Sequence, residues 1–255
     1  MKTKFISSFA IMAMMLTGCI TATSGNVNNG KDSDATIKKE IKTSSFNEIE
    51  VSQGIKVIVS QGKYPGKISV ATTPSAEKYL CVKVDKGTLK AYYANKSMTG
   101  ENIKGPSIIN VTIPELEEAD LSSGSYLQLK GHFTSNSKME FDLSSGSSLN
   151  IENLSCRDLS IDTSSGSRAT IQYFKGNLDA ESSSGSSITV KEAVGGALSA
   201  EASSGSGISL NSNKSDKIRA HASSGASITL SGSTGWLNKE ASSGGSVNAG
   251  NLNVK

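Results

Sequence analysis

The sequence predicts an all-β fold, a parallel β-helix or solenoid with about seven coils of roughly 20 residues each over residues 116–255. An irregular β-rich part over residues 37–115 precedes the coils. Three observations support this fold class. A Ser-Ser-Gly motif recurs at nearly constant spacing, apolar and polar residues alternate within each repeat, and residues aligned between repeats share their chemical character.

The spacing of the motif indicates a solenoid. Successive Ser-Ser-Gly glycines are 22, 20, 19, 20, 20 and 19 residues apart. They are Gly124, Gly146, Gly166, Gly185, Gly205, Gly225 and Gly244. A period near 20 residues over seven copies is typical of units that bury their apolar faces only by stacking on one another. Since glycine tolerates positive φ, we expect the motif to form a corner.

The alternation indicates strands on both sides of the corner. In residues 139–151 every second position is apolar or small, which is the period of a β-strand. Each coil is therefore predicted to hold two short strands joined at the Ser-Ser-Gly corner and closed by a variable loop, such as residues 153–157. Coils would lie about 4.8 Å apart.

Aligning the repeats on their glycines gives columns that we expect to point inward. Three columns are aliphatic, beginning at Met139, Leu127 and Leu129. Two columns nearest the corner are small, beginning at Ser123 and Ser125, and their hydroxyl groups should find partners within the stack. The last repeat departs from the pattern with Lys239, Gly245 and Ala249, as expected of a solenoid end that discourages edge pairing.

Residues 37–115 lack the Ser-Ser-Gly motif but contain six strand-like segments. These are residues 46–51, 55–59, 67–70, 80–84, 89–93 and 108–113. Residues 85–88, Asp-Lys-Gly-Thr, have the composition of a hairpin turn. The segment is either a separate cap or a set of earlier, irregular coils, and the sequence does not separate the two.

Residues 1–18 have the layout of an export signal, with Lys2 and Lys4 before a short apolar run. The run ends in Leu-Thr-Gly before Cys19, which resembles the lipobox of bacterial lipoproteins and implies acylation of Cys19. The alternative is an ordinary secretory signal with an unrelated cysteine. Residues 19–36 read as a flexible tether, so the expected partner is a membrane, reached through the lipid on Cys19.

The charge and the cysteine content exclude two further classes of protein. A formal net charge of +3 without basic clusters offers no footprint for nucleic acid. After Cys19 only Cys81 and Cys156 remain, which excludes a disulfide-rich scaffold. These two cysteines either form one bridge or stay as buried thiols. No cofactor-binding motif stands out, so no cofactor is expected.

Residues 46–62, which include Gln53-Gly54-Ile55-Lys56, resemble the start of the auto-transporter adhesin, head GIN domain family. The Ser-Ser-Gly copies are similar to the repeats of that family, and the resemblance covers about residues 38–250. It implies an exported β-helical domain, common in Bacteroidetes envelopes, with no established activity. Lys56 departs from the family motif, which carries Asn there, and we expect its side chain to point outward.

One outward column is rich in carboxylates and is the main candidate site. It comprises Asp120, Asp142, Asp162, Glu181, Glu201 and Glu240, with His221 in the remaining coil. Stacked carboxylates could bind calcium, or they could form a solvated edge that resists aggregation. On the opposite face, a row of short polar side chains that begins at Gln128 and Asn150 could meet a glycan or a protein.

Catalysis is not expected. The serines and carboxylates recur in every coil, whereas a catalytic site interrupts a repeat locally, and neither His132 nor His221 is placed as a base for a serine. The sequence also shows no cluster of Arg, Lys and Asp on neighbouring coils. It therefore predicts an outer-membrane lipoprotein of the cell envelope that is an adhesive or structural surface module, and it leaves open whether the solenoid faces the periplasm or the cell surface. The alternatives are a glycan- or calcium-binding module and a degenerate β-helix enzyme of polysaccharides.

Overall fold

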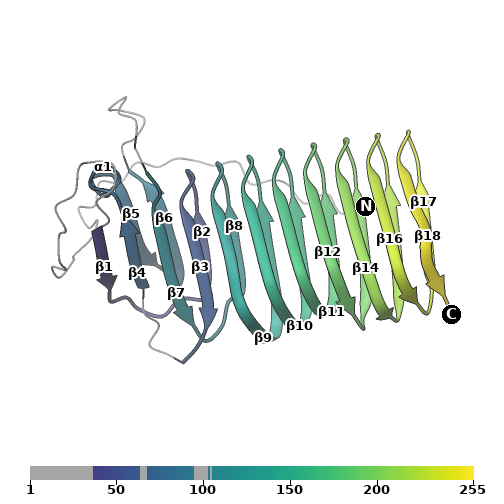
Figure 1. Cartoon of the computed structure of the whole chain (residues 1–255), viewed down its shortest axis with the longest axis horizontal. Helices are drawn as coiled ribbons and strands as arrows, with labels where there is room; N and C mark the ends of the chain where they lie inside the picture. The colour runs from purple at the N-terminus through teal and green to yellow at the C-terminus, as the bar shows by residue number, and fades with distance from the viewer. Residues whose placement is uncertain (1–36, 64–67, 95–102, 104) are drawn as a thin grey trace.

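The computed structural model describes residues 37–63, 68–94, 103 and 105–255, and they form a parallel β-solenoid (Figure 1). The predicted fold class is confirmed. The export signal, Cys19 and the tether lie outside the described residues. Among the described residues, no helix has the length and apolar character needed to cross a membrane.

The described residues of the first part of the chain form eight strands and one short helix. They are β1 (Ile37–Ile41), β2 (Glu48–Val51), β3 (Lys56–Gln61), β4 (Ile68–Thr72), α1 (Pro74–Glu77), β5 (Leu80–Asp85), β6 (Thr88–Tyr93), β7 (Ile108–Ile113) and β8 (Glu118–Leu121). All six strand-like segments predicted in this part are strands. The predicted hairpin is also present, since β5 and β6 pair antiparallel with Asp85 opposite Thr88.

The repeats supply the remaining strands. They are β9 (Tyr126–Leu143), β10 (Ser148–Thr163), β11 (Arg168–Ser182), β12 (Ser187–Val194), β13 (Ala197–Ala202), β14 (Gly207–Ser215), β15 (Lys217–Ala222), β16 (Ser227–Thr234), β17 (Leu237–Ala241) and β18 (Ser246–Val254). In β9, β10 and β11 the ladder continues through the bend opposite the corner, so residues 153–157 are strand rather than the predicted closing loop.

Neighbouring coils stack in parallel and align on the Ser-Ser-Gly motif. Leu149, for example, lies opposite Leu127 on one side and Ala169 on the other. The aliphatic columns point inward as predicted, and Leu127, Ile151 and Leu159 are 0–1 % exposed. Each coil thereby covers the apolar surface of the next. Coils that could not bury this surface alone share one continuous core.

The Ser-Ser-Gly corners run along the upper edge of the solenoid in Figure 1. In each corner the second serine has φ between 48° and 53° and the glycine between 70° and 77°. In the first corner the Ser125 N–H donates to the Ser122 carbonyl at 3.1 Å, and the Gly124 N–H donates to Ser145 of the next coil at 3.0 Å. This bond between coils recurs and helps to hold a serine in a conformation that L residues rarely adopt.

The corner geometry corrects one prediction about the core. The second serines of the motif were expected to point inward, but they are exposed at the tip of the turn. They are Ser123, Ser145, Ser165, Ser184, Ser204, Ser224 and Ser243. Two consecutive residues with positive φ interrupt the strand alternation, so the inward positions are the third residue before the glycine and the first residue after it.

The serine after each glycine is buried and bonded, as predicted. Its hydroxyl group donates to a carbonyl of the preceding coil, at distances from 2.6 to 3.1 Å. The donors are Ser125, Ser147, Ser167, Ser186 and Ser206. Alanine takes this place in the next coil, at Ala226, which is 1 % exposed.

We expect Ser206→Ala to lower the free energy of unfolding by about 1–2 kcal/mol, because it removes both hydrogen bonds of a buried hydroxyl group. The Ser206 hydroxyl donates to the Ser182 carbonyl at 2.6 Å and accepts from the Ser203 N–H at 3.1 Å. Ser204→Ala in the same motif changes an exposed hydroxyl and should alter stability by no more than about 0.5 kcal/mol. Denaturant unfolding followed by circular dichroism compares the two. Equal losses would contradict the role assigned to the inner serine.

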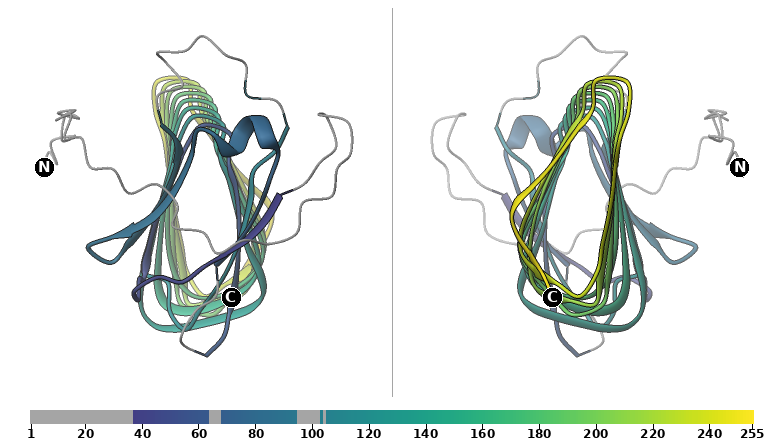
Figure 2. Two further views of the ribbon diagram at one scale, coloured as in Figure 1. Left: turned by 90° about the vertical axis from the view of Figure 1, so that its left-hand side faces the viewer. Right: turned by 90° about the vertical axis from the view of Figure 1, so that its right-hand side faces the viewer.

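The solenoid narrows towards its C-terminal end. The inward column at Phe141 continues as Ile161, Ala180, Ala200 and Ala220, so its side chains shrink from Phe to Ile and then remain Ala. In Figure 2 the C-terminal coils correspondingly trace a narrower outline than the teal coils. The interior is therefore filled by matching coil width to side-chain size.

The N-terminal part contains both a cap and early coils, which answers the question left open by the sequence. β2 and β3 form a coil that pairs in parallel with β8 and β9. β6 and β7 form another coil, stacked on the outer side of β2 and β3. The antiparallel strands β1, β4 and β5, with α1, lie beyond and beside this coil. Spatial order here differs from chain order.

The C-terminal coil ends the stack without such a cap among the described residues. Lys239 of β17 lies opposite Ala220, in an inward column, yet its side chain is exposed. A charge at an inward position of a terminal strand hinders pairing with another sheet edge.

Cys81 and Cys156 are buried free thiols, so there is no bridge between them. Burial, followed by the nearby Asp158 charge, raises the pKa of Cys156 to about 12.

Candidate functional site

The strands that lead into the corners form one wall of the solenoid, which we call the acidic wall. It consists of β2, β8, the C-terminal parts of β9, β10 and β11, and then β13, β15 and β17. Its outward residues form columns because the coils align without offset. The predicted acidic column lies on this wall, two residues along the strand from a second column that starts at Glu48 and Glu118.

The structure brings the predicted carboxylates together in one row. Asp120 lies opposite Asp142, Asp142 opposite Asp162, and the row continues through Glu181 and Glu201. His221 and Glu240 close it at the C-terminal end. At the other end it extends to Glu50, which was not predicted and forms an ion pair with Lys90 at 2.8 Å.

Desolvation, and then the charges of neighbouring carboxylates, favour the protonated form of the acids in this row. Desolvation, followed by the charge of Asp142, raises the pKa of Asp120 to about 6. Desolvation and the charges of Glu181 and Asp142 raise the pKa of Asp162 to about 6 as well.

Among the described residues, no three His, Cys, Asp or Glu side chains lie close enough together to bind a metal ion. Calcium binding by the row stays a prediction, which a calcium-induced rise in melting temperature would test.

We expect Asp162→Asn to stabilise the protein at pH 7 and to have little effect at pH 4. A raised pKa means that the folded state binds more protons than the unfolded chain between pH 3.8 and about 6, so stability falls as pH rises through that window. The gain at pH 7 should be no more than about 1 kcal/mol, because solvent screens this exposed side chain. Denaturant unfolding at the two pH values measures it.

Asp158 on the same coil supplies a control of opposite sign. Hydrogen bonds from Asn177 and then Arg157 lower its pKa, so its charged form stabilises the folded state above pH 3.8. Asp158→Asn should therefore destabilise the protein at pH 7, where Asp162→Asn stabilises it. A loss of stability in both variants would show that crowding does not govern the row.

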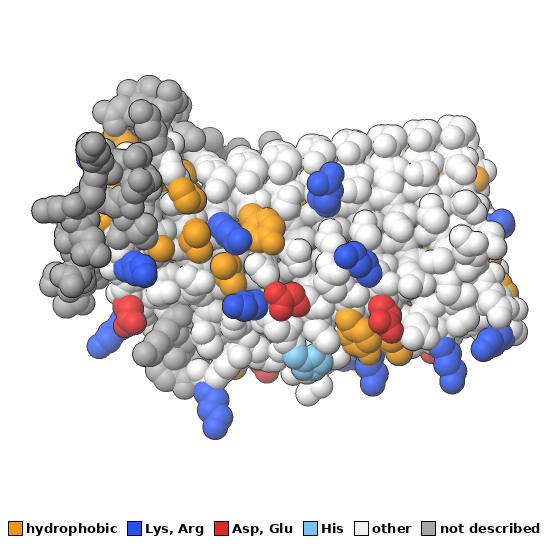
Figure 3. All heavy atoms as spheres, in the orientation of Figure 1, with side chains coloured by type: hydrophobic (Ala, Val, Ile, Leu, Met, Phe, Trp, Pro, Cys, Tyr) orange, Lys and Arg blue, Asp and Glu red, His pale blue; other side chains and the backbone are white. Residues whose placement is uncertain are grey.

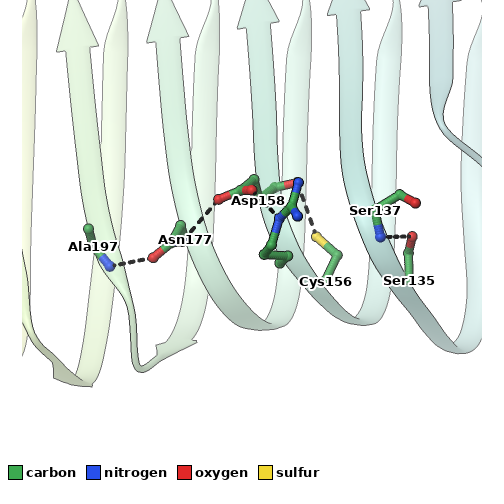
Figure 4. A network of polar contacts seen from close by, with 7 residues as sticks. Ser135, Ser137, Cys156, Asp158, Asn177 and Ala197 are labelled. Atoms are coloured by element: carbon green, nitrogen blue, oxygen red, sulfur yellow. Dashed lines mark hydrogen bonds and ion pairs between the residues drawn. The ribbon is translucent and has the colours of Figure 1, made fainter.

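Sequence reasoning missed a groove on the acidic wall. It has a volume of about 350 Å³ and runs across β9, β10, β11, β13 and β15 to Trp236. Along one border, Asn177 joins three coils, as Figure 4 shows. It donates to Asp158 at 2.9 Å and accepts from the Ala197 N–H at 2.9 Å. These two hydrogen bonds hold the Asn177 side chain in place and connect the coils at the border of the groove.

The groove also corrects the statement that Arg, Lys and Asp do not cluster on neighbouring coils. Lys138, Asp158, Asp179, Lys217 and Arg219 all line it. These residues come from β9, β10, β11 and β15, so only the stacking brings them together. Signals for it in the sequence were the exchange of a carboxylate for His221 and the basic residues Lys217 and Arg219 in the same repeat.

The opposite wall carries the predicted row of short polar side chains. It runs in register through Gln128, Asn150, Thr170, Thr189, Ser209, Thr229 and Asn248. This wall faces the viewer in Figure 3, where its C-terminal part is mostly uncharged and without a large hydrophobic patch. Lys56 lies partly exposed beside this row, as expected for an outward position, with its Nζ 4.7 Å from the centre of the Tyr126 ring.

Comparisons with solved structures show the same fold in several bacterial proteins. A "putative adhesin" of Bacteroides fragilis NCTC 9343 is 16 % identical, with a TM-score of 0.71 over 85 % of this chain and 98 % of that one. Two proteins of Parabacteroides distasonis ATCC 8503, a "putative lipid binding protein" and a "putative adhesin", have TM-scores of 0.67. They are 18 % and 15 % identical, and each match covers 84 % of this chain and 96 % of theirs. At such identities the likeness concerns the fold.

The sequence itself places the chain in a family. No curated protein matches it. The family described as "Putative auto-transporter adhesin, head GIN domain" matches residues 45–222, which include the Gln53-Gly54 segment and the first five Ser-Ser-Gly corners. The Gln53-Gly54 segment has φ values of 60° and 76° and so forms an earlier corner of the same kind. The chain therefore belongs to the auto-transporter adhesin, head GIN domain family.

Proposed function

We propose that this protein is a non-catalytic lipoprotein of the cell envelope that is anchored through Cys19 and presents its solenoid as an adhesive surface. The observation that carries the proposal is the unbroken stacking of the coils, which repeats two outward walls along the whole solenoid. Many weak, equivalent contacts along such walls give avidity without requiring one deep site. The adhesin description of the family agrees with a location in the envelope or at the cell surface.

The lipid anchor follows from the Leu-Thr-Gly sequence before Cys19. Several acyl chains, each contributing about 0.8 kcal/mol per buried CH₂, would hold the protein on a membrane. The tether over residues 19–36 would give the solenoid reach from that membrane. We infer the outer membrane as the location, with the solenoid exposed on the outside of the cell.

The experiment compares a deletion strain complemented with the wild-type chain, with Cys19→Ser, or with Cys81→Ala. The Cys81→Ala variant loses a buried thiol that has no part in anchoring. We expect Cys19→Ser to move from the membrane to the soluble fraction and to abolish adherence to glycan-coated surfaces, whereas Cys81→Ala retains both. Protease treatment of intact cells should remove the wild-type solenoid. Membrane retention of Cys19→Ser, or unchanged adherence of the deletion strain, would refute the proposal.

A further inference from the structure

The strand β15 places three basic side chains on the acidic wall. Lys217, Arg219 and His221 alternate with inward residues, and all three are exposed. Their neighbours in the preceding coil are Ala197, Ser199 and Glu201. Neither Lys217 nor Arg219 has a hydrogen-bond or ion-pair partner in the described part of the chain. The groove therefore contains two cations without an ion-pair partner, and the carboxylates of Asp158 and Asp179 line it two coils or more away from them.

An aromatic platform lies next to these cations. Trp236 is the only tryptophan of the chain and is 48 % exposed, although large apolar side chains in this fold are otherwise mostly buried. It precedes Leu237, which lies opposite Ile218, so Trp236 lies beside Lys217 about one coil spacing away. The small residues Ala197 and Ser199 line the groove on the other side of β15. Together they leave a hollow with an aromatic edge and a basic strand.

We propose that this groove binds an acidic sugar residue of a glycan. The indole of Trp236 would stack on the ring, and Lys217 and Arg219 would bind its carboxylate. The planar guanidinium group matches a carboxylate in two-point geometry, and an aromatic face offers apolar area to the C–H groups of a sugar. This inference rests on the proposed adhesive function and names the class of ligand for it.

The rest of the wall selects for a single, localised negative charge. Glu201 and Glu240 occupy the acidic row on the coils that flank His221. An extended polyanion, such as nucleic acid, would have to pass these carboxylates and would be repelled by them. A mostly neutral glycan that carries one uronic acid side group avoids this repulsion and still uses the two cations. A wholly neutral glycan would leave both cations without a partner.

The test uses the full-length protein in detergent and the fluorescence of Trp236, which reports only on this groove because no other tryptophan is present. The probe is a xylo-oligosaccharide with one glucuronic acid side group, and the control ligand is the same oligosaccharide without it. We expect the acidic probe to change the fluorescence at saturation and the neutral one to bind at least about tenfold more weakly.

Two variants test whether the acidic probe binds in the groove. Arg219→Gln should weaken binding of the acidic probe by about tenfold or more, since it removes a charged hydrogen bond. Arg168→Gln, on the opposite wall, should leave the affinity unchanged. Equal binding of both probes, no fluorescence change, or an unaltered affinity in Arg219→Gln would overturn the inference. Chromatography of the probe after incubation tests the proposed function separately, because cleavage would refute a non-catalytic role and leave the binding site intact.

Discussion

Replacing Gly176 with alanine is expected to lower the free energy of unfolding by more than about 4 kcal/mol, or to prevent folding. Gly176 has a φ of 145°, and a Cβ atom at this position would lie 2.0 Å from the carbonyl oxygen of Cys156 in the preceding coil. That oxygen belongs to the backbone of the stacked ladder, so it cannot move away without separating the coils. The same Cβ atom would lie 3.1 Å from the Phe174 ring.

Gly166→Ala is the matched control, because it changes a glycine near the start of the same coil. Gly166 has a φ of 73°, but no atom lies within 4 Å of where its Cβ would be. Only the backbone conformation opposes the substitution, at a cost of about 1–2 kcal/mol. Guanidinium unfolding of the purified variants, followed by circular dichroism, compares them. If the two variants lost similar stability, contact between stacked coils would not be what requires glycine at residue 176.

The difference between these two glycines shows what the sequence could and could not predict. Gly166 belongs to a repeated motif, so its place in a corner follows from the spacing alone. Gly176 has an aligned glycine in the next coil, Gly196, but no repeated motif, and its requirement depends on the carbonyl of a coil about 20 residues earlier. The inward columns were predictable for the same reason as the corners. The exposed tip serines, such as Ser145, were not, because two consecutive positive φ values turn this one position outward while the alternation on either side keeps its parity.

The N-terminal part was less predictable because it does not repeat. Its strands were visible as alternating segments, yet nothing in them indicates that the coil of β6 and β7 stacks outside that of β2 and β3. Pairing partners in an antiparallel cap depend on long-range contacts that a local pattern does not encode. The later coils escape this difficulty, because each coil has a nearly identical neighbour and the register is set by matching columns.

The candidate site also has one part that the sequence predicts, the acidic row, and one part that it does not, the groove. The acidic row follows from the repeat, so the spacing of the motif alone identifies its members. The groove depends on what three adjacent coils do differently, namely the small Ala197 and Ser199, the basic β15 and the exposed Trp236. Each of these residues is an ordinary surface residue in its own repeat. Only stacking places them side by side, so the deviation from the repeat, rather than the repeat, distinguishes the groove from the rest of the wall.

Replacing Phe141 with alanine should cost about 3–5 kcal/mol, although alanine is the native residue at the aligned positions Ala180, Ala200 and Ala220. Phe141 is 1 % exposed and lies between Ala119 and Ile161, in the wide part of the solenoid. Removing its ring leaves a cavity there, because the neighbouring coils hold the wide outline and cannot collapse onto the alanine. A consensus of the aligned repeats, in which alanine is the commonest residue here, would instead predict a small loss of stability.

Glu140→Ala on the same strand is the control, since Glu140 points outward and forms only an exposed ion pair with Lys138. It should change the free energy of unfolding by no more than about 1 kcal/mol. Denaturant unfolding of the two variants tests whether coil width, rather than repeat identity, sets the size of the inward residue. A loss below about 1.5 kcal/mol for Phe141→Ala would mean that the wide coils can contract to the width of the C-terminal ones. The narrowing of the solenoid would then be a consequence of side-chain size rather than a constraint on it.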